Sequence, residues 1–255
     1  MTKNNKTMAR YQSAAANRNR LLARLPRADY QRLLPRLEAV RLFVGDVLYQ
    51  PGEPQSHLYF PTSSVVSLVY TMKDGAMGEM GIVGRDGAVG MALFMGGGTR
   101  PNRALVQIGG DALRLSAKAL RSELKRSEAL ETLLLRYTQA LLTQISQTAV
   151  CNCLHPLEQR LCRWLLLCDD RAGPGELALT HALLGAMLGV RRETVTAAAR
   201  KLRAAKLIGY RRGRIAVVNR RGLESRVCEC YEVVRRETDR LLGGDHSAPR
   251  ALLQL

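Results

Sequence analysis

The sequence predicts an α+β protein with a β-rich N-terminal half, a long central helix and a C-terminal unit of short helices and strands. Residues 42–115 form short apolar runs separated by turn residues, and 13 of the 22 glycines fall between Gly45 and Gly110. Residues 127–151 contain no proline and repeat apolar residues at helical spacing. Residues 177–218 combine two short helical patterns with an alternating hairpin pattern.

Composition and charge indicate a globular protein with a polyanionic partner. The 255 residues are 46% hydrophobic, and 39 Lys plus Arg against 22 Asp plus Glu give a net charge of +17. Residues 186–221 hold 11 basic residues and one acidic residue, residues 1–41 hold 10 and 2, and residues 42–185 hold 13 of each. The ordinary hydrophobic content disfavours intrinsic disorder, and a neutral middle with two basic flanks, of which residues 186–221 are the denser, points to a localised polyanion site.

The N-terminal segment reads as a basic arm followed by short helices. We expect residues 1–20 to be a disordered arm, and residues 18–41 to form helices interrupted by Pro26 and Pro35. The polar start MTKNNKTMARYQ lacks the apolar core of an export signal, and no apolar run approaches the roughly 18 residues of a membrane span. We therefore expect a cytoplasmic location and no membrane partner.

The β-rich segment is most simply an antiparallel sandwich or jelly roll. Glycine recurs at every third position from Gly75 to Gly90, but the run is short and proline-free, which excludes collagen. We interpret these glycines as turn and close-approach positions.

The long helix is predicted from Ser127 to about Cys151. One stripe recurs along it at helical spacing: Leu130, Leu134, Tyr137, Leu141, Ile145. The spacing fits two uses equally, namely packing against its own domain and pairing with a second copy. Pro156 then starts a helix over residues 157–168, and residues 169–176 form a turn or linker.

The strongest motif is a winged helix-turn-helix. Thr180 caps a helix over 181–188, Gly189 provides the tight turn, and a second helix covers 191–205. Residues 207–210 and 214–218 form the hairpin wing. A small helical domain with an arginine-rich solvated face is the alternative, but the turn glycine, the wing and the single acid occur together, which favours DNA binding.

Residue chemistry suggests a role for each exposed side chain. Early residues of a recognition helix face base edges, so Arg192 suits guanine O6 and N7, and Glu193 suits cytosine N4. Hydroxyl and arginine side chains suit phosphate contacts. The candidate DNA-binding set is Thr180, His181, Arg191, Arg192, Glu193, Thr194, Thr196, Arg200, Arg211, Arg212, Arg214.

From Leu21 to Leu242 the order of these parts resembles the Crp/Fnr family of bacterial transcription regulators. Arg192-Glu193-Thr194-Val195 stands at the family's R-E-T-V recognition sequence, and residues 158–165 resemble its E-x-R-L-x-R-W-L helix. The resemblance implies a cyclic-nucleotide-binding-like sensor jelly roll at 21–126, a dimerisation helix at 127–154 and a DNA-binding domain at 155–242, with a tail at 243–255.

The resemblance also implies partners. They are double-stranded DNA with a palindromic operator, a second copy of the chain that pairs through the stripe on the long helix, and RNA polymerase. It thereby favours dimerisation over the alternative use of that stripe.

The sequence departs from the family at the effector pocket. The family holds a cyclic-nucleotide phosphate with Gly-Glu-Leu and an Arg two residues before an Ala, where this chain has Gly90-Met91-Ala92 and Asn102-Arg103-Ala104. We take Gly90, Met91, Arg100 and Arg103 as the candidate pocket, although both arginines also fit exposed loops. We expect the effector not to be cyclic AMP, and its identity stays open.

Two further departures concern a cluster and the operator. No cysteine precedes Cys151, so we expect no iron–sulfur cluster of the oxygen-sensing type. Ala197 stands where the cyclic-AMP receptor has a base-reading arginine, so the operators should differ at that base pair.

The remaining signals predict neither metal binding nor catalysis. Cys151/Cys153 and Cys228/Cys230 are spaced more closely than structural zinc ligands, and on predicted helices residues i and i+2 diverge, so we expect idle thiols. The four histidines are scattered and no catalytic set is found, so we expect a non-enzyme. The alternative is a ligand-binding jelly-roll module or enzyme with an accessory basic domain.

Overall fold

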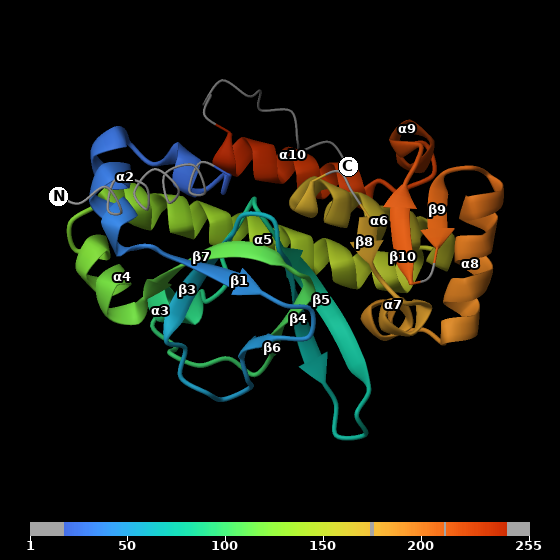
Figure 1. Ribbon diagram of the computed structural model, residues 1–255, viewed down its shortest axis with the longest axis horizontal. Helices are drawn as coiled ribbons and strands as arrows, with labels where there is room; N and C mark the ends of the chain where they lie inside the picture. Colours follow the sequence, from blue (N-terminus) through green and yellow to red (C-terminus); the bar gives the residue numbers. More distant parts are fainter. Residues whose placement is uncertain (1–17, 174–175, 212, 244–255) are drawn as a thin grey trace.

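The computed structural model describes residues 18–173, 176–211 and 213–243. Figure 1 shows an elongated molecule in which a β domain and a mostly helical domain lie toward opposite ends, with the long helix α5 (Glu128–Leu154) extending along both. The α+β class and the order of parts are therefore confirmed.

The N-terminal described segment is short helices, as the prolines predict. They are η1 (Leu22–Arg24), α2 (Arg27–Leu33) and η2 (Leu34–Arg36). Pro26 caps α2 and Pro35 lies inside η2. Asn19 is fully buried and its side-chain amide donates to the carbonyls of Pro61 and Gly87, so this residue anchors the chain on the β domain, while Arg18 and Arg20 are exposed. The rest of the expected arm, residues 1–17, lies outside the described residues.

The β domain is a pair of antiparallel sheets. Its strands are β1 (Glu38–Leu42), β2 (Val47–Tyr49), β3 (His57–Pro61), β4 (Val65–Thr71), β5 (Met77–Val83), β6 (Arg103–Ile108) and β7 (Gly110–Ser116). One sheet has the order β1-β7-β3 and the other β2-β6-β4-β5. Two helices, α3 (Ala92–Met95) and α4 (Ala117–Leu124), complete the domain.

Three glycines of the three-residue repeat are close-approach positions, and two of them face helices outside the β sheets. A Cβ on Gly87 would lie 2.5 Å from the Tyr137 ring on α5, and one on Gly84 would overlap Arg171 Cβ. The repeat thus lets the β domain contact α5 and the helix that follows it.

The predicted stripe on α5 faces the β domain of its own chain. Leu130, Leu134, Tyr137 and Leu141 are at most 5% exposed, and Ile145 packs against the same core. The Tyr137 hydroxyl donates to the Ala88 carbonyl over 3.0 Å. These side chains are therefore unavailable to a partner, which corrects their assignment to a dimer interface.

The C-terminal domain contains the predicted helices and wing, with an added strand. Its elements are α6 (Leu157–Ala172), β8 (Glu176–Ala178), α7 (His181–Leu188), α8 (Arg192–Ala204), β9 (Ile208–Arg211), β10 (Arg214–Val217) and α9 (Arg220–Glu224). Strand β8 pairs with β10, so the wing hairpin belongs to a three-stranded sheet. The expected linker at 169–176 is shorter than predicted because α6 continues to Ala172.

The last helix, α10 (Cys230–Leu242), returns along α5 toward the β domain (Figure 1). Leu241 and Leu242 are buried in the same core as Leu21 and Leu22. The first and the last described helices therefore pack in the same hydrophobic core.

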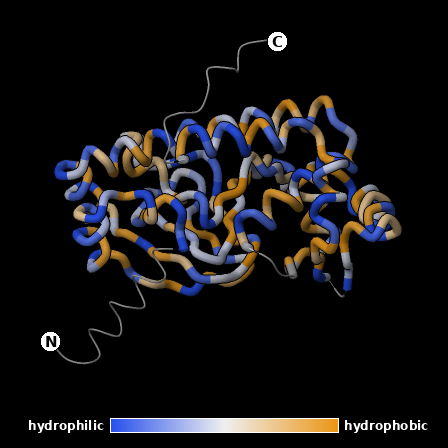
Figure 2. Tube along the Cα trace, turned by 90° about the horizontal axis from the view of Figure 1, so that it is seen from above, coloured by the Kyte–Doolittle hydropathy of each residue, from blue (hydrophilic) through white to orange (hydrophobic). Residues whose placement is uncertain are grey.

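Hydrophobic and hydrophilic stretches are interspersed along the described chain (Figure 2). Among the described helices, none combines the length and the apolar character that crossing a bilayer requires.

Candidate nucleic-acid interface

Two glycines and a threonine define the first helix of the motif. The Thr180 hydroxyl accepts a hydrogen bond from the Leu183 backbone N–H and caps α7. Gly189 ends α7 in the left-handed region, with φ of 65°, where a side chain would be strained. A Cβ on Gly185 would lie 2.8 Å from the Val190 carbonyl oxygen, so the turn passes directly over this residue.

Helix α8 buries one face and exposes the other. Val195, Ala198, Ala199 and Leu202 are buried against the domain core, as predicted. With 3.6 residues per turn, the opposite face carries Glu193, Ala197 and Arg200, which are exposed together with Arg191, Arg192 and Thr194. Glu193 in the first turn and Lys201 and Arg203 in the last turn also complement the helix dipole.

His181 and Thr196 are half-buried and join the two helices through a side-chain contact. The Thr196 hydroxyl lies 2.9 Å from His181 Nδ1 and 2.9 Å from the Arg192 carbonyl oxygen. The imidazole also stacks on Tyr210 of the wing, with ring centroids 4.4 Å apart. Burial, followed by the nearby Arg192 charge, lowers the pKa of His181 and favours the neutral ring. The stacked Tyr210 was not foreseen because nothing in its spacing marks it.

The wing places basic side chains beside α8. Arg211 and Arg214 are exposed at the ends of β9 and β10, and Gly213 takes the positive φ that the turn requires. Arg212, the third predicted wing arginine, lies outside the described residues. The exposed arginines of α8 and the wing thus belong to one compact unit.

A buried carboxyl connects this unit to the β domain. Trp164 Nε1 on α6 donates to Glu79 Oε1 on β5 over 2.7 Å, and the Ser67 hydroxyl donates to Glu79 Oε2 over 2.5 Å. Burial raises the pKa of Glu79 to about 7, partly opposed by those two hydrogen bonds and by Arg163 and Arg171. Trp164 belongs to the segment 158–165 that resembles the family's E-x-R-L-x-R-W-L helix. The sequence did not indicate that Glu79 would be its hydrogen-bond partner.

The four candidate effector residues have partners within the protein. Gly90 lies close to the His57 carbonyl, and Met91 is 2% exposed in the core. Arg103 donates to Met77 Sδ over 2.6 Å, while Arg100 interacts with the Tyr49 hydroxyl. Met91, which we expect at the position of the family's glutamate, is therefore an apolar and buried side chain.

The exposed face of α5 carries a different set of apolar residues from the predicted stripe. Leu135, Leu142, Val150 and Leu154 are 54%, 52%, 44% and 74% exposed. Leu135 and Leu142 are seven residues apart, which is the spacing of a helix-pairing seam.

Family comparisons identify one known domain in each half of the chain. Residues 40–127 match the cyclic nucleotide-binding domain, and residues 159–226 match the Crp-like helix-turn-helix domain. The fold and its motif thus define a regulator-type protein that combines a cyclic nucleotide-binding domain with a Crp-like helix-turn-helix domain. The chain belongs to the Crp/Fnr family of transcription regulators.

Solved structures share the fold. FixK2 from Bradyrhizobium japonicum is 19% identical with a TM-score of 0.64, covering 75% of this chain and 98% of its own. A Crp/Fnr-family regulator from Thermus thermophilus is 24% identical with a TM-score of 0.60, covering 76% and 98%. The c-di-GMP-responsive regulator CLP from Xanthomonas campestris is 19% identical with a TM-score of 0.59, covering 75% and 99%. No curated protein matches the chain.

Proposed function

We propose that this protein is a homodimeric regulator that reads a palindromic operator through α8 in the major groove. The observation that carries the proposal is the exposed face of α8, where Arg192, Glu193 and Arg200 stand beside the wing arginines in the R-E-T-V context. Arg192 and Glu193 read base edges, and Thr194, Arg200 and the wing contact phosphates. The regulator acts in the cytoplasm with RNA polymerase as a partner.

The second copy binds on the exposed face of α5. Leu135 and Leu142 present apolar surface there, whereas the inner stripe is already covered by the β domain. A two-fold dimer through this face gives two copies of α8, which matches a palindromic site.

The sensor domain does not hold cyclic AMP as its family relatives with an intact pocket do. Met91 replaces the glutamate and is buried, and Arg103 is engaged by Met77. Cyclic AMP should therefore produce no thermal shift in the purified protein, whereas a ligand present at 100 times its dissociation constant would stabilise it by about 2.7 kcal/mol.

The deciding experiment selects bound fragments from genomic DNA and then compares variants on the selected operator. R192A should relax the preference at one G·C pair per half-site by about 1–3 kcal/mol. R200A should weaken binding to all sequences and reduce the salt slope by about 1. R126A, at an exposed arginine in the turn between α4 and α5, is the control and should bind as the wild type does. Unchanged base preference in R192A would show that α8 is not the reader.

A further inference from the structure

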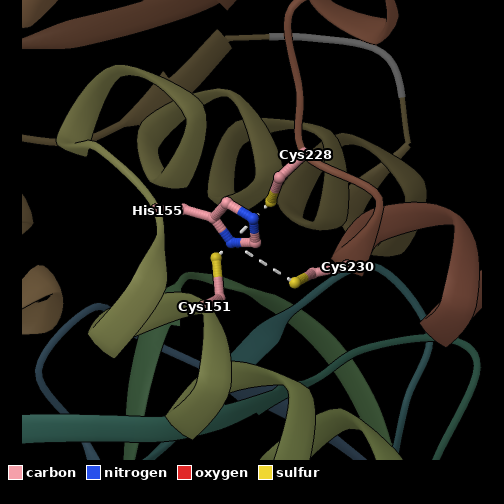
Figure 3. Close-up of side chains that lie close together, drawn as sticks. All are labelled: Cys151, His155, Cys228 and Cys230. Carbon is pink, nitrogen blue, oxygen red and sulfur yellow. Dashed lines mark hydrogen bonds between the residues drawn. The ribbon is translucent and has the colours of Figure 1, made fainter.

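Three cysteines and a histidine from distant parts of the chain meet at the end of α5 (Figure 3). Cys151 lies in the last turn of α5 and His155 caps that helix, while Cys228 precedes α10 and Cys230 begins it. Their four ligand atoms all lie within 4.8 Å of one another, and the three thiols are buried. Neither the effector region nor α8 includes any of them.

The geometry of the group fits a single tetrahedral ion. Zinc–sulfur bonds of about 2.3 Å and zinc–nitrogen bonds of about 2.05 Å place tetrahedral ligand atoms about 3.6–3.8 Å apart. Cys151 Sγ lies 3.5 Å from Cys228 Sγ, and His155 Nδ1 lies 3.6 Å from Cys230 Sγ. Donors this close surround one ion and leave no room for a multi-iron cluster.

The surroundings of the group also match those of a metal centre. Glu229 Oε2 lies 3.4 Å from His155 Nε2, so the carboxylate orients the ring with Nδ1 toward the sulfurs. The buried guanidinium of Arg163 interacts electrostatically with all three cysteines. Three thiolates and a divalent ion carry one net negative charge, which Arg163 balances.

We propose that Cys151, His155, Cys228 and Cys230 bind one Zn²⁺. Zinc is favoured because thiolate and imidazole donors in tetrahedral geometry select it over the hard cations. Binding forms three Zn–S bonds and one Zn–N bond and releases the three thiol protons to solvent, with no electron transferred.

The local structure around Cys228 differs from the one on which the expectation of idle thiols was based. The sequence pattern placed Cys228 and Cys230 on one helix, where their side chains would diverge. In the structure Cys228 lies in the loop before α10, and both side chains point inward. The expected divergence does hold for the other pair, because Cys153 is exposed while Cys151 is buried.

The ion joins the α5–α6 junction to the start of α10. These are the two places where the DNA-binding domain connects to the rest of the chain. Bound zinc fixes the distance between them, and its removal frees both connections.

The test uses the full-length protein, purified under reductant with a tag free of histidine. Elemental analysis should find one zinc per chain, and Co²⁺ in its place should show tetrahedral ligand-field bands with thiolate charge transfer. C228S should lower Zn²⁺ affinity, measured by competition with a chelating dye, by at least about 100-fold. C153S is the matched control and should keep both stoichiometry and affinity.

E229Q keeps the test decisive if C228S fails to fold. Glu229 is 75% exposed in its side chain, so the substitution leaves the core untouched. Loss of the carboxylate behind His155 should cost about 10–100-fold in Zn²⁺ affinity. Reduced, folded wild-type protein that takes up less than about a tenth of an equivalent of Zn²⁺ would overturn the proposal, as would equal affinity in C228S, E229Q and the wild type.

Discussion

Gly185 is the residue on which the geometry of the helix-turn-helix most directly depends. The Val190 carbonyl oxygen would lie 2.8 Å from a Cβ at this position, and neither that oxygen nor the Cα that would carry the Cβ can move without changing the backbone of the turn. G185A should therefore destabilise the protein by about 1–3 kcal/mol and weaken operator binding, because α8 shifts relative to α7. Thermal unfolding and DNA titration measure the two effects.

Gly97 provides the control for this prediction. Its Cβ would lie 3.6 Å from the Thr99 carbonyl oxygen, which is ordinary contact, and its φ is not positive. G97A should leave both stability and DNA binding unchanged. If G185A is as stable as G97A, the close passage of the turn over Gly185 is not a packing constraint.

Helix α5 presents two apolar faces with different consequences for mutation. Leu134 is fully buried in the β-domain core, so L134A should cost about 2–5 kcal/mol in the free energy of unfolding. Leu142 is 52% exposed, so L142E should leave that free energy nearly unchanged and shift the molecule from dimer to monomer. Chemical denaturation measures the free energy of unfolding, and sedimentation velocity measures the oligomeric state. Full dimerisation of L142E would show that the second copy binds to a surface other than the exposed face of α5.

Helix α5 shows that sequence periodicity can predict which side of a helix is buried but not which part of the protein covers it. The spacing of Leu130, Leu134 and Tyr137 correctly predicted a long helix with one buried side, because a 3.6-residue period needs only local information. It could not say which surface covers that side. The glycines at 84 and 87, which admit Arg171 and Tyr137, were recognised as close-approach positions, but their partners lie more than 45 residues away.

Across the whole molecule, the Glu79–Trp164 hydrogen bond links the β domain to the helix-turn-helix domain. The pKa of Glu79 in the fold, about 7, exceeds its ordinary value of 4.5 because burial disfavours the carboxylate. The fold therefore prefers the protonated acid, and the stability it contributes is complete below pH 4.5 and is lost as pH rises through 7. Between pH 5 and 8 this loss should amount to about 2–3 kcal/mol.

E79Q isolates this effect from other titrations. A glutamine can still accept from Trp164 and is neutral at every pH, so its stability should fall less than that of the wild type as pH rises. Unfolding curves at pH 5 and pH 8 for both proteins give the difference. Parallel pH profiles would mean that Glu79 does not titrate in this range.

At the same scale, the sequence indicated a β-rich segment and a helix-turn-helix segment but not the contacts between them. Both segments were recognisable because each has its own local pattern of strands or helices. The partners Glu79 and Trp164 are 85 residues apart, and Cys151 and Cys228 are 77 apart. No local pattern encodes such pairs, since the fold alone brings them together.

Because α10 returns along α5, the β domain, α5 and α10 form one continuous structural unit, which we call the body of the protein. The chain leaves that body at His155 and re-enters it at Cys230, and the side chains of these two residues are in contact. Residues 157–227 are therefore an insertion with adjacent ends, carried by a body made of the β domain, α5 and α10. In engineering terms, a replacement for this insertion would need ends that lie equally close together and a new partner for Glu79, because Trp164 belongs to the replaced segment.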